Sequence, residues 1–310
     1  MHHSTDTMVG GGPYAVSPSA TVHSAYQARI QSLATMIAPR ILLNTRGSGN
    51  YGESSLSAFY TIDQDALPQV LLNLGSNDRS ETPLKRTDID LGAGRLAFYI
   101  DGVLSHTEAD ALAACAEAVL EDNGHSRVAP GINTPPGMRV NEAAHWFPSF
   151  QAAPNFLGPL FERIQHLVPQ ELGGLPLYQG LSQKVAQFKY VDGDRFERHV
   201  DGLFPGQGAN ASGDGIEQWS GVQSGMSIIF YCNDNESDGL DGGETRLWSA
   251  DGSRHVDVVP RKGRALFFRR GSADAVLHAG LPVRGAVPKY MALINLAYGR
   301  RVGTTPLSMV

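Results

Sequence analysis

Residues 184–201 read KVAQFKYVDGDRFERHVD, and this stretch decides the fold. Two β-rich halves flank the turn Asp192-Gly193-Asp194, so the stretch predicts two short strands joined by a tight connection. Side chains at positions i and i+2 of a strand point to the same side of a sheet. His199 and Asp201 therefore share one face, and we expect them to hold one metal ion together.

A third candidate ligand, His278, follows much later in the chain, within the strand pattern Ala275–His278. Two neutral imidazoles and one carboxylate on a single face, with the opposite face open, form the ligand set of non-haem Fe(II) oxygenases. The tripeptide H-x-D arises often by chance, so the neighbouring residues decide between a metal site and a coincidence. Five other histidines are interpreted as surface or core side chains: His106, His125, His145, His166 and His255.

The bulk composition is that of an ordinary globular protein. The chain has 310 residues, of which 42% are hydrophobic and 18% charged, and a formal net charge of -6. Without a basic stripe, a nucleic-acid partner is not expected. No apolar run has the length of a membrane span, so no membrane association is expected either. Cys115 and Cys232 are predicted to be buried, reduced thiols.

The N-terminal region allows two interpretations. Residues 1–50 contain one acidic residue, Asp6, and the segment Ser24–Ala38 has apolar residues at helical spacing around Arg29. A surface helix packed on the main domain has this pattern, and so does an organelle transit peptide. We favour the surface helix and expect the protein in the cytoplasm.

Two helices are predicted before the β-rich part of the chain. Ser105 and Glu108 have the spacing of a capping box directly before the helical segment Ala109–Leu120. A second apolar stripe predicts a helix over Asn155–Val168. Both stripes are expected to pack on a sheet.

After Gly180 the pattern changes to short β-rich segments separated by Gly and Asp clusters. So many short strands in one stretch predict a jelly roll, also called a double-stranded β-helix, which can hold a ligand between its two sheets. The fold class is therefore mainly β with flanking helices (α+β). The predicted strands are 184–191, 195–201, 226–232, 245–248, 255–259, 265–268, 275–278 and 290–298.

One predicted connection is long. Gly202–Ser224 contains six glycines and directly follows Asp201. Loops of this length without secondary structure are usually lids, binding loops or disordered segments. Its place beside the candidate metal pair favours a substrate lid.

Taken together, the sequence blocks resemble the prolyl-4-hydroxylase-like branch of the Fe(II)/2-oxoglutarate-dependent oxygenases. The resemblance covers Arg95–Gly299 and includes the helices before the barrel. Each block alone is weak, whereas all of them in this order form a specific signal. They are Phe188–Tyr190, Gly193–Phe196, His199–Asp201, Ile229–Asn233, Gly242–Thr245, Val258–Pro260, Gly263–Phe268, His278–Val283 and Lys289.

The resemblance implies that His199, Asp201 and His278 are the catalytic iron ligands. Three protein ligands leave three positions on Fe(II) for 2-oxoglutarate and O2, the two co-substrates. It also implies that Lys289 pairs with the distal carboxylate of 2-oxoglutarate, since a flexible ammonium suits one end of a dicarboxylate. Arg284, in a turn flanked by Pro and Gly, is the rival for this role.

Other residues match the family less closely. Tyr190 matches a tyrosine that helps to hold the co-substrate or lines the pocket, whereas Phe230 stands where some relatives have a second tyrosine. Arg139, Asn141 and Trp146 resemble a stretch that borders the substrate entrance in relatives. Arg139 either meets a substrate carboxylate or forms a surface ion pair.

The resemblance implies a dioxygenase that hydroxylates an unactivated C–H bond of a peptidyl proline, an amino acid or a small metabolite, with decarboxylation of 2-oxoglutarate to succinate. The expected partner is thus a small-molecule or peptide substrate. The alternative is a catalytically inactive jelly-roll binding or scaffold protein. The chain is divided into an N-terminal extension, 1–90, partly irregular and packed on or trailing from the core, an oxygenase domain, 91–301, and a C-terminal tail, 302–310.

Overall fold

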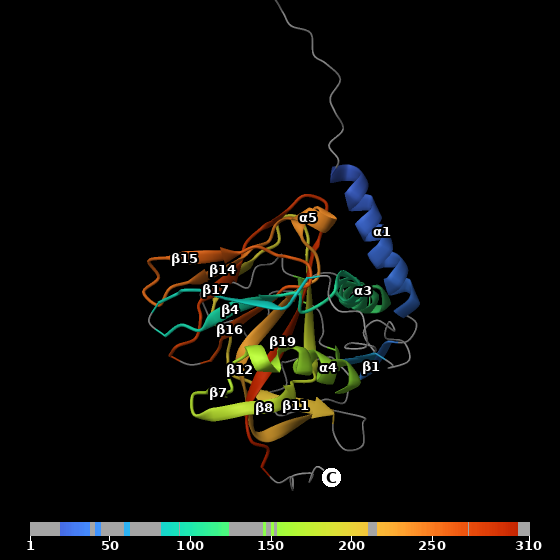
Figure 1. The fold of residues 1–310 in the computed structure, drawn as a ribbon. Coiled ribbons are helices and arrows are strands. Elements are labelled where there is room, and N and C mark those ends of the chain that lie inside the picture. The colour runs from blue at the N-terminus through green and yellow to red at the C-terminus, as the bar shows by residue number, and fades with distance from the viewer. Residues whose placement is uncertain are drawn as a thin grey trace, which may run out of the picture.

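A computed structural model shows two stacked β-sheets with helices along one side (Figure 1). This is the predicted class, a mainly β jelly roll with flanking helices. The structure describes residues 19–37, 41–44, 59–62, 82–92, 94–123, 145–146, 150–151, 154–209, 216–271 and 273–302.

The large sheet supplies the main wall of the barrel. Its central strands are antiparallel, with β19 hydrogen-bonded to β9 on one side and to β12 on the other. Along the sheet the order is β1 (Ile41–Asn44), β2 (Phe59–Ile62), β6 (Phe150–Gln151), β9 (Lys184–Tyr190), β19 (Lys289–Gly299), β12 (Ile216–Tyr231), β16 (Ala265–Arg269), β4 (Ala97–Asp101) and β3 (Lys85–Asp88). Four strands pair off this path: β5 (His145–Trp146) with β9, β8 (Leu175–Leu181) with β19, β7 (Glu171–Leu172) with β8, and β11 (Pro205–Ala209) with β12.

The small sheet covers the other side of the barrel. Its order is β10 (Phe196–His199), β17 (His278–Gly280), β14 (Thr245–Trp248) and β15 (His255–Val258). The strands β13 (Asp241–Gly242) and β18 (Val283–Arg284) pair with each other and form a separate two-stranded ribbon. The pairing of β10 with β17 brings together segments that lie about eighty positions apart in the sequence.

Strand alternation gives the large sheet two different faces. On the outer face, Gln187 of β9 donates its side-chain amide to the carbonyl of Leu112, and Tyr290 of β19 donates to Glu117. On the inner face, Ser227 of β12 contacts Asp201, which follows β10, and Phe268 of β16 lies against His278 of β17. The outer face therefore packs on a helix, and the inner face lines the barrel.

The helix on the outer face is α3 (His106–Asn123), and its start is fixed by the predicted capping box. The backbone N–H of Ser105 donates to Glu108 at 2.7 Å, and the N–H of Glu108 donates to the Ser105 hydroxyl at 3.2 Å. The predicted second helix is present as α4 (Pro154–Ile164), followed by a 3-10 turn over Gln165–Leu167. A short helix, α5 (Asn235–Asp238), follows β12.

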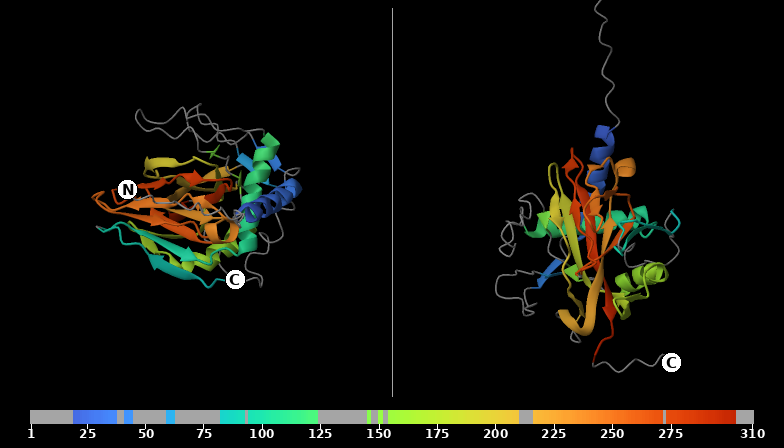
Figure 2. Two further views of the ribbon diagram at one scale, coloured as in Figure 1. Left: turned by 90° about the horizontal axis from the view of Figure 1, so that it is seen from above. Right: turned by 90° about the vertical axis from the view of Figure 1, so that its left-hand side faces the viewer.

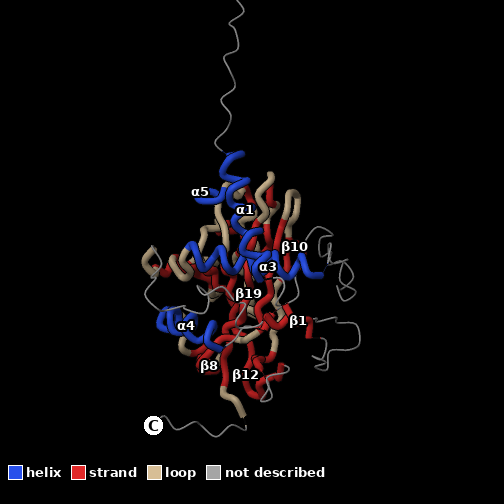
Figure 3. The backbone as a smooth tube through the Cα atoms, turned by 90° about the vertical axis from the view of Figure 1, so that its right-hand side faces the viewer, coloured by secondary structure: helices blue, strands red, loops and turns tan. Residues whose placement is uncertain are grey.

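The N-terminal helix α1 (Ser19–Ile37) packs on the domain, as the favoured interpretation predicted. Tyr26, Ile30 and Ile37 are buried, and Arg29 forms ion pairs with Asp110 of α3 at 2.8 Å and with Asp238 of α5 at 3.3 Å. Seen from above, α1 and α3 lie side by side (Figure 2). Viewed from the side on which these two helices lie, α1 and α3 cross each other in front of the strands (Figure 3).

The prediction of a long loop without secondary structure over Gly202–Ser224 was wrong. Residues of this segment form β11 and the first part of β12, which pair antiparallel. The glycines that suggested a loop make room for an aromatic ring instead. A Cβ at Gly206 or Gly208 would lie 2.9 or 2.4 Å from the ring of Trp219, so these positions must stay small for the hairpin to close.

The strand predicted over Ala275–His278 begins only at His278. The guanidinium of Arg95 donates to the carbonyls of Ala273 and Ala275 at 2.7 and 2.6 Å. These carbonyls are thus satisfied by a side chain and not by a neighbouring strand. The two cysteines, Cys115 and Cys232, are free and buried as predicted. In the part of the chain that the structure describes, no helix is both long and apolar enough to cross a membrane.

Candidate metal centre

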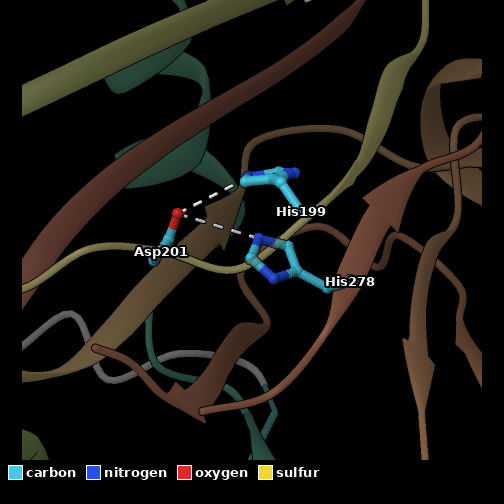
Figure 4. A group of neighbouring side chains, drawn as sticks. All are labelled: His199, Asp201 and His278. Carbon is cyan, nitrogen blue, oxygen red and sulfur yellow. Dashed lines mark ion pairs between the residues drawn. The ribbon is translucent and has the colours of Figure 1, made fainter. Parts of the chain in front are cut away.

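The three candidate ligands converge at one end of the β10–β17 pair. His199 and His278 are register partners, so their imidazole rings lie opposite each other with centroids 4.2 Å apart. Asp201 follows β10, and its Oδ1 lies 3.5 Å from Nε2 of His199 and 3.9 Å from Nε2 of His278 (Figure 4). One ligand atom from each residue lies within 4.8 Å of the other two. A single cation can therefore contact all three.

Backbone carbonyls set the orientation of both imidazoles. Nδ1 of His199 lies 2.7 Å from the carbonyl of Glu197, and Nδ1 of His278 lies 3.1 Å from the carbonyl of Val276. A carbonyl only accepts hydrogen bonds, so the proton of each neutral ring belongs on Nδ1 and the lone pair on Nε2. Both lone pairs then point toward Asp201, which is how metal-binding histidines are usually held.

The electrostatics favour neutral imidazole beside an ionised carboxylate. Burial lowers the pKa of His278 to about 4, against the opposing attraction of Asp201, so the ring is neutral at pH 7. Burial alone would raise the pKa of Asp201, but His278, His199 and Arg270 together hold it well below its usual range. The side chain of Ser227 donates to Oδ2 of Asp201, which leaves Oδ1 directed at the two Nε2 atoms.

This set of donors fits a divalent first-row metal. Nitrogen from two neutral imidazoles and oxygen from one carboxylate match the ligand preference of Fe(II). Two aromatic rings limit the movement of the imidazoles, because Phe196 lies 4.3 Å from His199 and Phe268 lies 4.3 Å from His278, centroid to centroid. The site is thus oriented before any metal binds.

Lys289 lies on the inner face, at the start of β19. Its Nζ donates to the carbonyl of Gly243 at 2.6 Å and lies 5.5 and 5.4 Å from the ring centroids of Tyr190 and Tyr231. The side chain is only 3% exposed, and burial lowers its pKa to about 7, opposed by the charge of Glu244. Within the described residues it has no ion pair. A buried amine without an ion pair is a candidate site for an anion.

Arg284, the rival of Lys289 for the distal carboxylate, lies on the β13–β18 ribbon. The guanidinium of Arg284, whose side chain is 60% exposed, pairs with Asp241 at 2.9 Å on the β13–β18 ribbon. Tyr190 is buried and is the register partner of Lys289. Sequence reasoning assigned no role to Tyr231 or to the carbonyl of Gly243. Tyr231 stands at i+4 from Ser227 on β12, and this alternation places it on the inner face.

The predicted substrate-side residues are less well defined. Arg139 and Asn141 lie outside the described residues. The backbone of Trp146 belongs to β5 and pairs with Phe188 of β9. The structure thus brings together His199, Asp201 and His278 at one point and Lys289 with Tyr190 at another.

Comparison with known proteins agrees with this site. Residues 185–297, from β9 into β19, match the model of the 2OG-Fe(II) oxygenase superfamily. No curated protein matches the chain. The matched segment contains all three candidate ligands. Residues 185–297 are therefore similar to a 2OG-Fe(II) oxygenase domain, and this similarity supports the predicted enzyme class and its use of Fe(II), 2-oxoglutarate and O2.

The chain is also similar to solved prolyl hydroxylases. One is a prolyl-4-hydroxylase from Pseudomonas putida, with 24% identity over 40% of this chain and 55% of that chain and a TM-score of 0.24. A prolyl hydroxylase from Trichoplax adhaerens, in complex with a peptide fragment of the hypoxia inducible factor oxygen degradation domain, has 15% identity over 89% of this chain and 93% of that chain and a TM-score of 0.31. Prolyl 4-hydroxylases from Phytophthora capsici have 17% identity over 67% and 60%, with a TM-score of 0.35. The chain thus spans about half the length of the first of these.

Proposed function

We propose that this 2OG-Fe(II) oxygenase domain hydroxylates an unactivated C–H bond of a peptidyl proline, an amino acid or a small metabolite. In the overall reaction, 2-oxoglutarate loses CO2 and becomes succinate. One atom of O2 enters succinate, and the other enters the new hydroxyl group. The observation that carries this proposal is the convergence of one ligand atom from each of His199, Asp201 and His278 within 4.8 Å.

His199, Asp201 and His278 would hold the metal. When bound, Fe(II) supplies the oxygen-activating redox chemistry that no side chain provides. The protein contributes the orientation of the ligands. The carbonyls of Glu197 and Val276 fix the two imidazole tautomers, and Ser227 holds the carboxylate.

Lys289 would bind the distal carboxylate of 2-oxoglutarate. Its amine is buried on the inner face of the large sheet, and the three ligands lie across the barrel on the small sheet and directly after β10. Among the described residues, Nζ has a carbonyl, but no carboxylate, within hydrogen-bonding distance. A dicarboxylate whose near end lies at the metal would bring the missing negative charge. The rings of Tyr190 and Tyr231 exclude water beside Nζ and so strengthen that charge pair. We favour Lys289 over Arg284 for this role, because Arg284 is exposed and already pairs with Asp241.

The substrate side stays a proposal from the sequence. We assign Arg139, Asn141 and Trp146 to the border of the substrate entrance. The peptide-bound relative supports a peptide as one substrate class. Amino acids and small metabolites are the other two, and an acidic net charge of -6 does not favour a nucleic acid.

Succinate release tests the proposal. The purified chain, with Fe(II), 2-oxoglutarate, ascorbate and O2, is offered proline peptides, free amino acids and small metabolites. We expect one class to raise succinate release and to gain a hydroxyl group by mass spectrometry. His199→Ala should abolish both signals, whereas His255→Ala, at an exposed histidine of β15, should retain them. Equal succinate release from the wild type and His199→Ala would contradict the proposal and favour a binding protein.

A further inference from the structure

A buried arginine next to the metal centre has no role in the function proposed so far. Arg270 directly follows β16, and its side chain is among the largest that the structure buries completely, with 2% of the residue exposed. Its charge is close enough to Asp201 to lower the pKa of that carboxyl group. Burying a guanidinium costs free energy that an ion pair normally offsets. In the described part of the chain, Arg270 forms none.

The guanidinium instead bridges two parts of the barrel. Nε donates to the carbonyl of Gly202 at 2.7 Å, and Nη1 donates to Oδ1 of Asn295. Gly202 belongs to the segment that follows β10, directly after Asp201. Asn295 belongs to β19 of the large sheet and is the register partner of Ser227, which itself donates to Asp201. Arg270 thus connects the segment that carries the metal carboxylate to the wall of the barrel.

Further contacts hold the same segment, here called the carboxylate segment (Asp201–Phe204). The N–H of Gly271 donates to the carbonyl of Asp201 at 2.8 Å. Ser224 and Phe204 exchange two hydrogen bonds of 2.8 Å each. The ring of Phe204, 43% exposed, lies 5.0 Å from the guanidinium carbon and covers it. Gly271 has a φ of +67°, and a Cβ there would lie 2.1 Å from Leu203, so the segment packs closely on residues 270–271.

From this geometry we propose that Arg270 is a positioning residue for the metal site. Through its bridge from Gly202 to Asn295, it fixes the carboxylate segment and so sets the affinity of the site for a divalent cation. The inference rests on the proposed function, because it requires that Asp201 is a metal ligand. It adds the device that keeps this ligand in place when the metal is absent.

A guanidinium suits this task better than an ammonium. Its planar fork reaches two acceptors on different elements in a fixed geometry, whereas a lysine offers one mobile point charge. Partners that orient metal ligands typically contribute a factor of about 10–100 in metal affinity. The bridge, and not the charge alone, is therefore expected to matter.

The test is anaerobic equilibrium dialysis with Fe(II) alone, at pH 7, on folded wild type and variants. Arg270→Gln removes the charge, and Arg270→Lys keeps the charge but not the fork. We expect both to weaken Fe(II) binding about tenfold or more. Asn295→Ala, a smaller change, removes one end of the bridge and should weaken binding in the same direction. If the Arg270 variants do not fold, Asn295→Ala tests the bridge in their place.

Arg264→Gln is the matched control. Arg264 directly precedes β16, as Arg270 directly follows it, and is held by Asp101 at 2.6 Å. Its loss should lower the melting temperature and leave Fe(II) affinity within about twofold of the wild type. A purely structural arginine at position 270 would behave in the same way.

Each alternative outcome overturns the inference. Unchanged Fe(II) affinity in folded Arg270→Gln makes the residue structural. Tighter binding in Arg270→Gln shows that repulsion between two cations dominates. Full affinity in Arg270→Lys shows that charge alone suffices. If the wild type itself binds no Fe(II), the proposed function fails, and this result is distinct from all three.

Discussion

Two lysine–tyrosine pairs on the same two strands show the difference between the faces of the large sheet. In the β9–β19 register, Lys189 pairs with Tyr290, and one position further along, Tyr190 pairs with Lys289. Strand alternation directs the first pair outward and the second inward. The two pairs share residue types, strands and neighbours in sequence, and they differ in what each face provides.

On the outer face the charges are satisfied. Both Lys189 and the hydroxyl of Tyr290 contact the carboxylate of Glu117, which α3 brings to the sheet. On the inner face, Lys289 has the carbonyl of Gly243 and two aromatic rings, and no carboxylate of the described residues contacts it. The outer pair stabilises the fold. The inner pair leaves a buried amine without an ion pair among the described residues, which suits the anionic co-substrate proposed above.

The largest difference is expected in activity. Lys289→Met should lower 2-oxoglutarate turnover at least about 100-fold, because a buried ion pair with a bound carboxylate contributes several kcal/mol. Lys189→Met should stay within about threefold of the wild type. The rate of succinate release, with the substrate to be hydroxylated at saturation, measures the turnover of both variants. Equal losses in the two variants would remove the distinction between the faces.

The order of the two variants should be reversed in stability, so that Lys189→Met is the less stable one. Without 2-oxoglutarate, Lys289→Met removes a desolvated amine and should raise the free energy of unfolding by about 1–4 kcal/mol. Lys189→Met leaves Glu117 without its cation and should lower it by about 1–3 kcal/mol. Urea denaturation at pH 8 measures both values. Destabilisation by Lys289→Met would mean that its amine is already compensated in the free protein.

The lowered pKa of Lys289 predicts a pH dependence. Above its pKa of about 7, the free protein holds a neutral amine that must take up a proton to bind a carboxylate. KM for 2-oxoglutarate should therefore rise up to tenfold per pH unit above pH 7. Lys289→Arg, which stays charged, should give a nearly flat profile, and a parallel rise in this variant would contradict the assignment.

The same shift affects stability. Between pH 7 and the ordinary value of 10.5, the unfolded chain binds a proton at Lys289 that the folded chain does not. The contribution of this residue to the free energy of unfolding should thus increase with pH in that range. Lys289→Met should lack this contribution in the same urea titrations.

The smallest effects are expected from the tyrosine hydroxyls. Tyr190→Phe keeps the ring beside Lys289, so KM for 2-oxoglutarate should change by no more than a few-fold. Tyr290→Phe removes the hydrogen bond to Glu117 and should cost about 1 kcal/mol of stability without changing KM. Comparing KM with the urea midpoint in both variants checks this. A reversed pattern would exchange the roles of the two faces.

Much of the fold follows from local signals in the sequence. The capping box placed the start of α3, and the strand pattern Thr245–Trp248 matches β14 residue for residue. The β11–β12 hairpin was missed because its glycines have the composition of a loop. Gly206 and Gly208 are needed in this hairpin because the ring of Trp219 packs against both and leaves no room for a side chain. Such a contact is not visible in a local window of sequence.

The site divides in the same way. Spacing placed His199 and Asp201 together, the strand pattern that ends at His278 supplied the third candidate ligand, and the family resemblance added Lys289. The partners that orient them had no signal of their own. The carbonyls of Glu197, Val276 and Gly243 belong to the backbone, and any residue type offers the same group. Arg270 lies far from Asp201 in sequence, so only the fold brings its guanidinium near the carboxylate.

Stoichiometric Fe(II) binding tests the central claim most directly. Anaerobic dialysis of the wild type and of the control His255→Ala should give one Fe(II) per chain. His278→Ala removes one of three converging ligands and should leave no stoichiometric ion. One Fe(II) per chain in all three proteins would show that the metal is held elsewhere and would contradict the assignment of His199, Asp201 and His278.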